Sequence, residues 1–330
     1  MNPVLSLIIP VYKTEKYVEA CLNSVFSQLP EWVEVIVVND GTPDESMPIV
    51  KRVFSQWIDC GQLILLEQKN MGPGAARNNG IRKAKGDFLA FLDSDDVIFQ
   101  NYFSEVEVTL KDGVADIIEF GFQRFNFVSD LSSGNYNSLY HFDGLQKLSV
   151  VRHDIFSVGC WYPSTRIYRR NIFEKILFKE GTHYEDLMTI PFIYINELMV
   201  FFINKPMLGY RINPNSITAT HTEKQLSDLY IFYKSIALDV QPDALNILKL
   251  KTARSMVFFN SELKSKSFSI NEIVREVRST KLTPMIYKKL HLADRLFFRF
   301  PSVYIFVDKF RVPLKMVFSR IKSILRSLFS

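Results

Sequence analysis

Four short apolar runs, each followed by a polar turn, dominate the first hundred residues and constrain the fold more than any other feature. They cover residues 5–12, 33–38, 63–66 and 88–92. Between them, apolar residues recur three and four positions apart, which predicts helices at about 17–26, 45–57 and 74–85. Strands that are apolar throughout and alternate with helices are typical of a parallel sheet covered on both faces. The sequence predicts an α/β fold with a mainly parallel, Rossmann-like sheet and a helical C-terminal region.

Three carboxylates directly follow the fourth apolar run, in Asp93-Ser94-Asp95-Asp96. Like charges this close raise each other's pKa unless a cation shares them. Hard oxygen ligands suit Mg²⁺ or Mn²⁺, and these ions usually complete their coordination shells with phosphate oxygens. The cluster therefore predicts a metal site for a phosphorylated substrate. The alternative is that these acids only cap the following helix, since Asp is favoured at helix N-termini.

Other polar residues follow neighbouring strands at the same edge of the predicted sheet. Tyr12 follows the first run and Asp40 the second, and ligands of such sheets bind at the carboxyl ends of the strands. After the third run, the glycine-rich stretch 72–77 opens a helix. Its small residues allow close approach to a phosphate or a sugar at the helix N-terminus. Close helix packing is an equally good explanation for them.

Composition limits the class of protein. A chain of 330 residues with 47% hydrophobic residues can bury a sizeable core, in two domains or in one domain with an appendage. Its three cysteines are widely spaced without a CxxC motif, which favours free thiols in a reducing compartment. The first residues lack a signal-peptide pattern, and no apolar run approaches the roughly 18 residues that span a bilayer. We expect a cytoplasmic protein.

Charge is distributed unevenly along the chain. From Lys249 onward there are 18 Lys/Arg against 5 Asp/Glu, whereas the preceding part has 22 against 30. A basic tail predicts an anionic partner surface. Apolar residues within 314–328 keep helical spacing among Lys and Arg, as in a helix that lies on anionic lipids. We expect residues 294–330 to hold the protein on the inner face of the cell membrane, unless that stripe packs on the protein's own core. Nucleic acid is not expected, because the aromatic residues of the tail form apolar clusters.

Four segments, taken together, resemble the family 2 glycosyltransferases with the GT-A fold. Their order and spacing over about 90 residues carry the resemblance, with Thr42 in place of the more usual Ser. A weaker likeness extends over 161–173, 183–187 and 210–216. The four segments are Pro10-Val11-Tyr12, Asp40-Gly41-Thr42, Gly72 through Gly80 with Ala76-Arg77-Asn78, and Asp93-Ser94-Asp95-Asp96.

The resemblance implies an inverting enzyme that moves a sugar from a nucleotide-sugar, with a UDP-sugar favoured, to a hydroxyl of an acceptor. The acceptor would be a glycan or a polyprenyl-linked glycan in bacterial surface polysaccharide synthesis. The residues expected to bind the nucleotide-sugar are Pro10, Tyr12, Asp40, Gly72, Arg77, Asp93 and Arg211.

The resemblance also implies roles in catalysis. Asp95 would bind Mn²⁺ or Mg²⁺ directly, and Asp93 would touch the ribose or the metal through water. Asp186 would be the general base, with Glu185 as the second choice. The alternative for this acidic pair is a solvated first helical turn. Trp161 would stack on the acceptor sugar or belong to the core. His183 and His221 are possible metal neighbours, although a lone histidine is more often structural.

The predicted organisation has three parts: a nucleotide-sugar-binding half at 1–98, an acceptor-binding half at 99–222, and a basic helical region at 223–330. Two other functions compete. One is a non-catalytic nucleotide-sugar binder or membrane-docked assembly protein, which would be free to lose the acids that this chain retains. The other is a nucleotidyltransferase that makes the donor. It would show a glycine-rich basic turn where this chain has residues 11–15, Val-Tyr-Lys-Thr-Glu.

Overall fold

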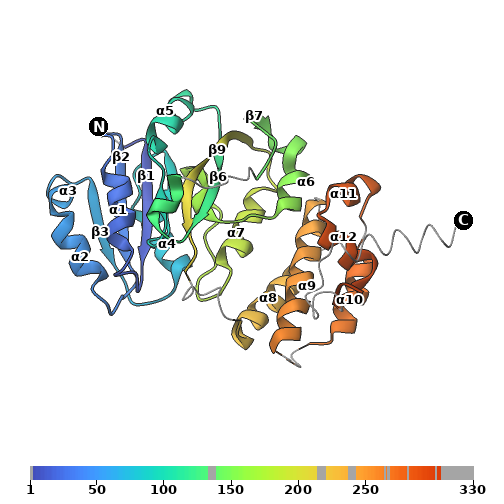
Figure 1. Cartoon of the computed structure of the whole chain (residues 1–330). Coiled ribbons are helices and arrows are strands. Elements are labelled where there is room, and N and C mark those ends of the chain that lie inside the picture. Colours follow the sequence, from blue (N-terminus) through green and yellow to red (C-terminus); the bar gives the residue numbers. More distant parts are fainter. Residues whose placement is uncertain are drawn as a thin grey trace, which may run out of the picture. The chain divides into compact units, whose positions relative to one another are not determined.

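The computed structural model forms two compact units, which are shown in Figure 1. The first, called the α/β unit, comprises Met1–Arg152 and Cys160–Ala219, and the second, the helical unit, comprises His153–Gly159 and Thr220–Ser330. The α/β unit contains the segments that carry the family resemblance. The structure describes residues 3–132, 139–213, 221–236, 243–263, 265, 268–280, 282–301 and 303–305.

The first half of the α/β unit is the expected alternation of strands and helices. Its four strands lie in the order β3-β2-β1-β4 and all pair in parallel, which confirms the predicted parallel sheet for this half. The strands are β1 (Leu5–Val11), β2 (Val33–Asn39), β3 (Leu63–Glu67) and β4 (Phe88–Phe91). The helices are α1 (Val18–Phe26), α2 (Ser46–Val53), α3 (Ser55–Asp59) and α4 (Pro73–Lys83).

One predicted helix is wrong in detail. The helix expected at about 45–57 is split at Phe54, whose φ of −112° lies outside the helical range. The Phe54 side chain is fully buried, and its ring centroid lies 5.1 Å from that of Phe26 and 5.8 Å from that of Trp57. The helix is thus interrupted at the residue whose aromatic side chain is buried, and the spacing of apolar residues in the sequence does not indicate this interruption.

The second half of the α/β unit extends the same sheet with mixed strand directions. Strand β8 runs antiparallel between β4 and β6, β6 and β9 are parallel, and β5 and β7 pair antiparallel with β9. The strands are β5 (Val97–Ile98), β6 (Ile117–Phe125), β7 (Gly144–Lys147), β8 (Arg166–Arg169) and β9 (Met199–Arg211). The helices are α5 (Tyr102–Asp112), η1 (Val128–Ser132), α6 (Leu148–Val158), η2 (Pro163–Thr165), η3 (Arg170–Glu174) and α7 (Glu185–Ile193). Helix α6 belongs to the α/β unit up to Arg152 and to the helical unit from His153 on.

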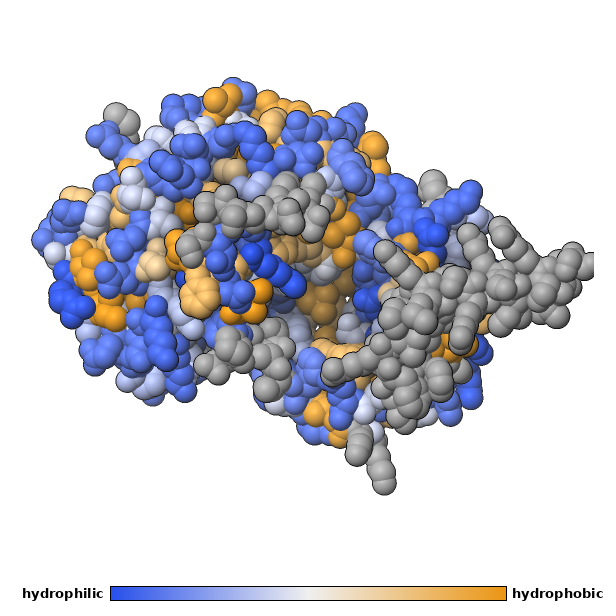
Figure 2. Space-filling model, viewed as in Figure 1, coloured by the Kyte–Doolittle hydropathy of each residue, from blue (hydrophilic) through white to orange (hydrophobic). Residues whose placement is uncertain are grey.

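Both faces of the central strands are buried. Successive side chains of a strand point to opposite faces, and Leu7 and Ile8 of β1 are both fully enclosed. Leu7 packs in one core cluster with Leu22 and Val25 of α1, whereas Ile8 lies against Gly80 of α4. Each such side chain contributes about 1.5–3 kcal/mol by leaving water. On the surface, the face of the α/β unit in Figure 2 is mostly hydrophilic, with hydrophobic residues in small separate areas.

The helical unit is held around a buried carboxylate. Asp294 is 0% exposed and forms ion pairs with Lys251 at 3.1 Å and with Arg254 at 2.8 Å, which join α12 to α9. No helix in the described part of the chain is long and apolar enough to cross a membrane. The helices of this unit are α8 (Glu223–Ser235), α9 (Ala244–Leu263), α10 (Ile270–Ser279), α11 (Pro284–Lys289) and α12 (Leu292–Arg299).

The predicted start of the membrane-associating segment, at residue 294 of 294–330, is wrong. Asp294, Leu296 and Phe297 are buried within the helical unit, because α12 packs there through its apolar side and its paired carboxylate. The predicted membrane contact therefore does not include these three residues. The apolar stripe within 314–328 lies outside the described residues.

Candidate active site

The carboxyl ends of three parallel strands bring together the predicted donor-binding residues. Val11 is paired with Asn39 across β1 and β2, and the Asp40 amide donates to the Val11 carbonyl at 3.0 Å. Tyr12 and Asp40 are therefore neighbours at one edge of the sheet. On the other side of β1, the β4 register places Ile8 opposite Phe91, two residues before Asp93. Pro10 lies within β1 itself and is partly buried.

The Asp40 carboxylate orders the loop that leads into α4. Oδ1 accepts hydrogen bonds from Gln68 Nε2 and the Met71 amide, and Oδ2 accepts one from the Gly72 amide, each at 2.9 Å. A carboxylate offers about four acceptor positions. Three are occupied here, and the side chain is only 3% exposed. One acceptor position of Asp40 is therefore left for a ligand donor.

Backbone conformation and packing explain why glycine occupies two positions of the glycine-rich stretch. Gly72 has φ of +88°, a left-handed conformation that L side chains rarely adopt. A Cβ on Gly74 would lie 2.8 Å from the Lys179 carbonyl oxygen, so only glycine lets the segment before α7 pass so close to α4. The positive φ thus accounts for Gly72, and close packing accounts for Gly74, without a bound phosphate.

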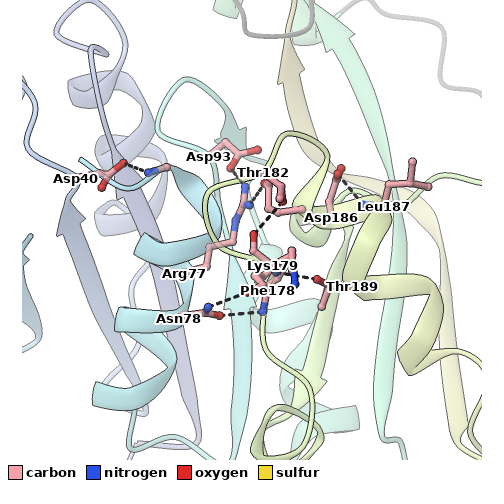
Figure 3. A network of polar contacts seen from close by, with 12 residues as sticks. Asp40, Arg77, Asn78, Asp93, Phe178, Lys179, Thr182, Asp186, Leu187 and Thr189 are labelled. Atoms are coloured by element: carbon pink, nitrogen blue, oxygen red, sulfur yellow. Dashed lines mark hydrogen bonds and ion pairs between the residues drawn. The ribbon is translucent and has the colours of Figure 1, made fainter. Parts of the chain in front are cut away.

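Arg77 joins the two acidic segments of the site (Figure 3). Its Nη2 lies 2.7 Å from Asp93 Oδ1, and its Nη1 lies 2.5 Å from Glu185 Oε1. Arg77 is 4% exposed. Burial lowers its pKa, but the charges of Asp93 and Glu185 outweigh this effect and raise the pKa above its ordinary value. Arg77, which was predicted to bind the nucleotide-sugar, is buried and bridges two carboxylates.

Asn78 holds the segment that approaches α7, a role that sequence reasoning missed. Its Nδ2 donates to the Phe178 carbonyl and to Glu180, and its Oδ1 accepts from the Phe178 amide, all within 2.9 Å. Figure 3 shows Asn78 directed at this segment from α4. The sequence signal that could have indicated this role is the position of Asn78 next to Arg77 in the third family-like segment.

The acidic cluster has an excess of negative charge. Burial, and then Asp93, raise the pKa of Asp95, and burial followed by Asp93 and Asp95 raises that of Asp96. Asp96 is 1% exposed; its Oδ1 accepts the Arg211 amide, and its Oδ2 has no hydrogen-bond partner among the described residues. An oxygen-only donor set with a buried, unpaired carboxylate oxygen fits a hard divalent cation.

The described residues do not converge into a preformed metal site. They contain no group of three or more His, Cys, Asp or Glu arranged around a point that could hold an ion. His221 belongs to the helical unit, where it pairs with Glu262 at 3.2 Å and stacks on Phe259. The fit of a cation therefore rests on the chemistry of Asp93, Asp95 and Asp96.

Arg211 holds the acidic segment from β9. Its Nε donates to the Asp95 carbonyl at 2.7 Å. Its guanidinium lies 4.4 Å from the Phe125 ring centroid and 4.8 Å from that of Tyr17. These contacts orient the guanidinium at the acidic strand end, where it was expected to meet the donor. Ser216 of the same predicted segment lies outside the described residues.

The two acids at the start of α7 have different environments. Glu185 is 8% exposed and pairs with Arg77, which excludes the alternative of a solvated helical turn. Asp186 is partly buried, and the Leu187 amide donates to its Oδ1 at 2.7 Å. Burial, and then the charge of Glu185, raise the pKa of Asp186 to about 7. A carboxylate with that pKa suits proton transfer near neutral pH.

Trp161 lies in the core. It is 5% exposed, its ring packs edge-on against Tyr194, and Arg166 lies over it at 5.8 Å. The core alternative therefore describes Trp161 better than sugar stacking, for which little of the ring is accessible. The next residue, Tyr162, is partly buried and stacks on Tyr210, a contact that sequence reasoning did not foresee.

Comparisons with known proteins identify the family of the chain. The model of Glycosyl transferase family 2 matches residues 6–177, more than half of the chain. Glycosyltransferase GlyA of Streptococcus pneumoniae serotype 4 is 30% identical over 235 residues, which are 68% of this chain and 33% of GlyA. The uncharacterized glycosyltransferase EpsJ of Bacillus subtilis is 26% identical over 321 residues, 90% of this chain and 91% of EpsJ. The chain thus spans a third of one relative and nearly all of the other.

Solved structures share the fold. The crystal structure of S. aureus TarS 1-349 in complex with UDP-GlcNAc has a TM-score of 0.66 at 20% identity, covering 92% of this chain and 89% of that chain. Mannosyltransferase PcManGT from Pyrobaculum calidifontis, in complex with GDP-Man and Mn²⁺, has a TM-score of 0.53 at 14% identity, covering 94% and 88%. This likeness confirms the predicted GT-A fold. With the family match, it follows that the chain belongs to glycosyl transferase family 2 and is a glycosyltransferase.

Proposed function

We propose that this glycosyltransferase moves a hexosyl or N-acetylhexosaminyl group from a nucleotide-sugar to an acceptor hydroxyl with inversion at the anomeric carbon. The observation that carries the proposal is the bridge from Asp93 through Arg77 to Glu185, beside Asp186 with a pKa of about 7. The bridge joins the strand end expected to meet the donor to the helix expected to supply the base. The complexes of TarS with UDP-GlcNAc and UDP support a UDP-sugar as the donor.

The donor would lie along the carboxyl ends of β1, β2 and β4. Tyr12 offers a partly exposed ring for the base, and Asp40 has one remaining acceptor position for a donor group of the nucleotide. Asp95, together with Asp93, would hold Mn²⁺ or Mg²⁺. When bound, the cation supplies Lewis-acid stabilisation of the departing diphosphate. The negative surplus at this strand end supports a cation there.

Asp186 would accept the proton of the attacking hydroxyl. The acceptor oxygen forms a bond to C1 of the donor sugar while the bond between C1 and the diphosphate oxygen breaks. The nucleoside diphosphate leaves on the opposite side, so the anomeric centre inverts. Glu185 is a poorer base because its carboxylate is buried and already engaged in an ion pair with Arg77.

The acceptor would be a glycan or a polyprenyl-linked glycan used in surface polysaccharide synthesis. The basic balance from Lys249 onward supports an anionic membrane partner, which would place the enzyme peripherally on the inner face of the cell membrane. Because α12 packs within the helical unit, we assign the membrane contact to residues 306–330. A lipid-linked acceptor would be presented at that surface.

Two measurements on the full chain test this function. A panel of nucleotide-sugars is screened by thermal shift with and without Mn²⁺, since a donor that binds only the folded state raises its melting temperature. The stabilising donor is then incubated with bacterial lipid extract, and release of free nucleoside diphosphate is followed. We expect metal-dependent stabilisation by a UDP-sugar and metal-dependent release of UDP. Stabilisation without release would favour the non-catalytic nucleotide-sugar binder, and stabilisation by none of the donors would contradict both.

A further inference from the structure

An aromatic cluster from three separate segments has no role in the function described so far. Tyr162, just before η2, stacks on Tyr210 of β9 with ring centroids 5.2 Å apart and an angle of 19°. Phe122 of β6 packs against both rings, at 5.6 Å and 5.7 Å. All three side chains are partly buried, unlike Trp161 and Tyr168 nearby in sequence, which are enclosed in the core.

Tyr210 directly precedes Arg211, whose amide donates to Asp96 Oδ1 at 2.8 Å, so the stacked pair adjoins the acidic strand end. Burial raises the pKa of Tyr162, and among the charges acting on it is that of Asp186. Burial also raises the pKa of Tyr210, and after Tyr162 the acids that act on it are Asp93, Asp96 and Asp95. The charges of Asp186 and of the acidic strand end thus act on the pair, and the backbone of Arg211 connects Tyr210 to that strand end.

The surroundings of the pair are those of a sugar-binding surface. Sites for small ligands combine aromatic walls with a few polar groups that fix orientation. Here two partly exposed tyrosine rings, which carry hydroxyl groups, are accompanied by Arg124, whose side chain hydrogen-bonds to Tyr162. A pyranose ring presents an apolar C–H face that can cover an aromatic ring and hydroxyls at its edge that can bond to such groups. The cluster therefore matches a pyranose better than it matches a purely apolar ligand.

We infer that Tyr162 and Tyr210 form the platform for the acceptor sugar, with the hydroxyl to be glycosylated directed at Asp186. This inference rests on the proposed function, because it takes Asp186 as the base. The acceptor is favoured over the donor sugar for a positional reason. The nucleotide is assigned to the edge formed by β1, β2 and β4, whereas the pair comes from β9 and the segment before η2.

Binding of simple glycosides tests the platform without requiring turnover. The methyl β-glycosides of glucose, galactose and N-acetylglucosamine are titrated into the full chain and observed by saturation-transfer-difference NMR. We expect transfer to the ring C–H protons of at least one glycoside, and binding about 3- to 10-fold weaker in Tyr162→Ala, the scale of one lost aromatic contact. Tyr162→Phe keeps the ring and should bind nearly as well as the wild type.

A matched control removes a stacked tyrosine elsewhere. Tyr230 stacks on Phe268 in the helical unit, so Tyr230→Ala loses a similar contact and should leave glycoside binding unchanged. Circular dichroism verifies that each variant folds. Equal binding by wild type and Tyr162→Ala, or absence of saturation transfer in the wild type, would overturn the platform.

A competition arm separates acceptor from donor. Added UDP-sugar should leave the glycoside signal in place, and its displacement of the glycoside would assign the pair to the donor sugar and overturn the inference. Failure of the proposed function would look different. It would be absence of UDP release by a wild-type protein whose glycoside binding still depends on Tyr162.

Discussion

Two buried charge centres, one in each unit, have opposite composition. In the α/β unit one cation, Arg77, joins two carboxylates, and in the helical unit one carboxylate, Asp294, joins two cations. Counted as single charges, the first centre has a negative surplus and the second a positive one. The first stands beside further acids at a sheet edge, where it contributes to the raised pKa of Asp186. The second only ties α12 to α9. The same type of interaction thus lies beside the candidate base in one unit and holds helices together in the other.

The largest effect should come from removing the acid assigned to the metal. In Asp95→Ala, metal-dependent UDP release should be lost at every Mn²⁺ concentration, because the variant lacks the carboxylate proposed to bind the metal directly. Tryptophan fluorescence and the melting temperature should remain close to wild type, since Asp95 is not a core residue. Activity within a few-fold of wild type at saturating Mn²⁺ would refute the assignment.

Replacement of the proposed base should have the next largest effect. Asp186→Asn keeps the shape of the side chain and removes the proton acceptor, so transfer should fall roughly 10²- to 10⁴-fold while UDP-sugar binding persists. Asp112→Asn, at the exposed end of α5, is the control. If Asp186→Asn transfers normally and Glu185→Gln does not, the base is Glu185 despite its ion pair with Arg77, and the assignment of Asp186 is wrong.

The two charge centres can be broken separately. Arg77→Met leaves buried Glu185 unpaired, and Asp294→Asn leaves two partly buried cations without their partner; each should cost about 3 kcal/mol. All three tryptophans lie in the α/β unit, so the fluorescence transition in urea reports that unit. This transition should shift in Arg77→Met and stay in place in Asp294→Asn. The lower stability of the helical unit in Asp294→Asn should be visible by circular dichroism instead.

A surface control and a clear contrary outcome accompany this pair. Arg82→Met changes an exposed arginine of the same helix α4 and should leave the transition in place. Equal shifts of the fluorescence transition in Arg77→Met and Asp294→Asn would show that the two units unfold together. The two charge centres would then stabilise the same unfolding unit rather than each its own.

The pH dependence provides a smaller effect with a defined sign. With a pKa of about 7 for Asp186, the basic form increases as pH rises, so transfer should increase about eightfold from pH 5.5 to 6.5 and level off above pH 7.5. The same raised pKa means that the folded state holds a proton that the unfolded state loses near 3.8, so this group's stabilising contribution falls between about pH 4 and 7. A pH-independent rate over this range would argue against Asp186.

The smallest effect on transfer should come from the tail. Deletion of residues 306–330 preserves buried Tyr304 and α12, and it should abolish binding to vesicles that contain anionic lipid while lowering transfer to a soluble acceptor little. A full-length variant with Lys315, Arg320, Lys322 and Arg326 changed to Gln tests the charge alone. Equal vesicle sedimentation of the full-length and shortened proteins would remove the membrane role.

The sequence predicted the first half of the sheet because its strands are apolar throughout and end in recognisable turns. It was less informative after Asp96, where β6 to β9 mix aromatic and polar residues and adopt both directions. The Arg77 bridge was not foreseen, because its partners lie 16 and 108 residues away in the chain. Similarly, burial separates Trp161 from Tyr162, although composition makes the two equally attractive as sugar-stacking residues.

Helix α4 and the residue before it contact several segments of the candidate site. Within its first turns and the residue before it, Gly72 meets the Asp40 carboxylate, Arg77 meets Asp93 and Glu185, and Asn78 fastens the segment at Phe178. Each residue of an α-helix turns the chain by about 100°. A single residue inserted between Gly72 and Arg77 would thus point the arginine away from both carboxylates and disengage Asn78. Under the proposed function, the spacing between the leaving group and the base therefore depends on the residue spacing within α4, and insertions that surface loops accept would be excluded there.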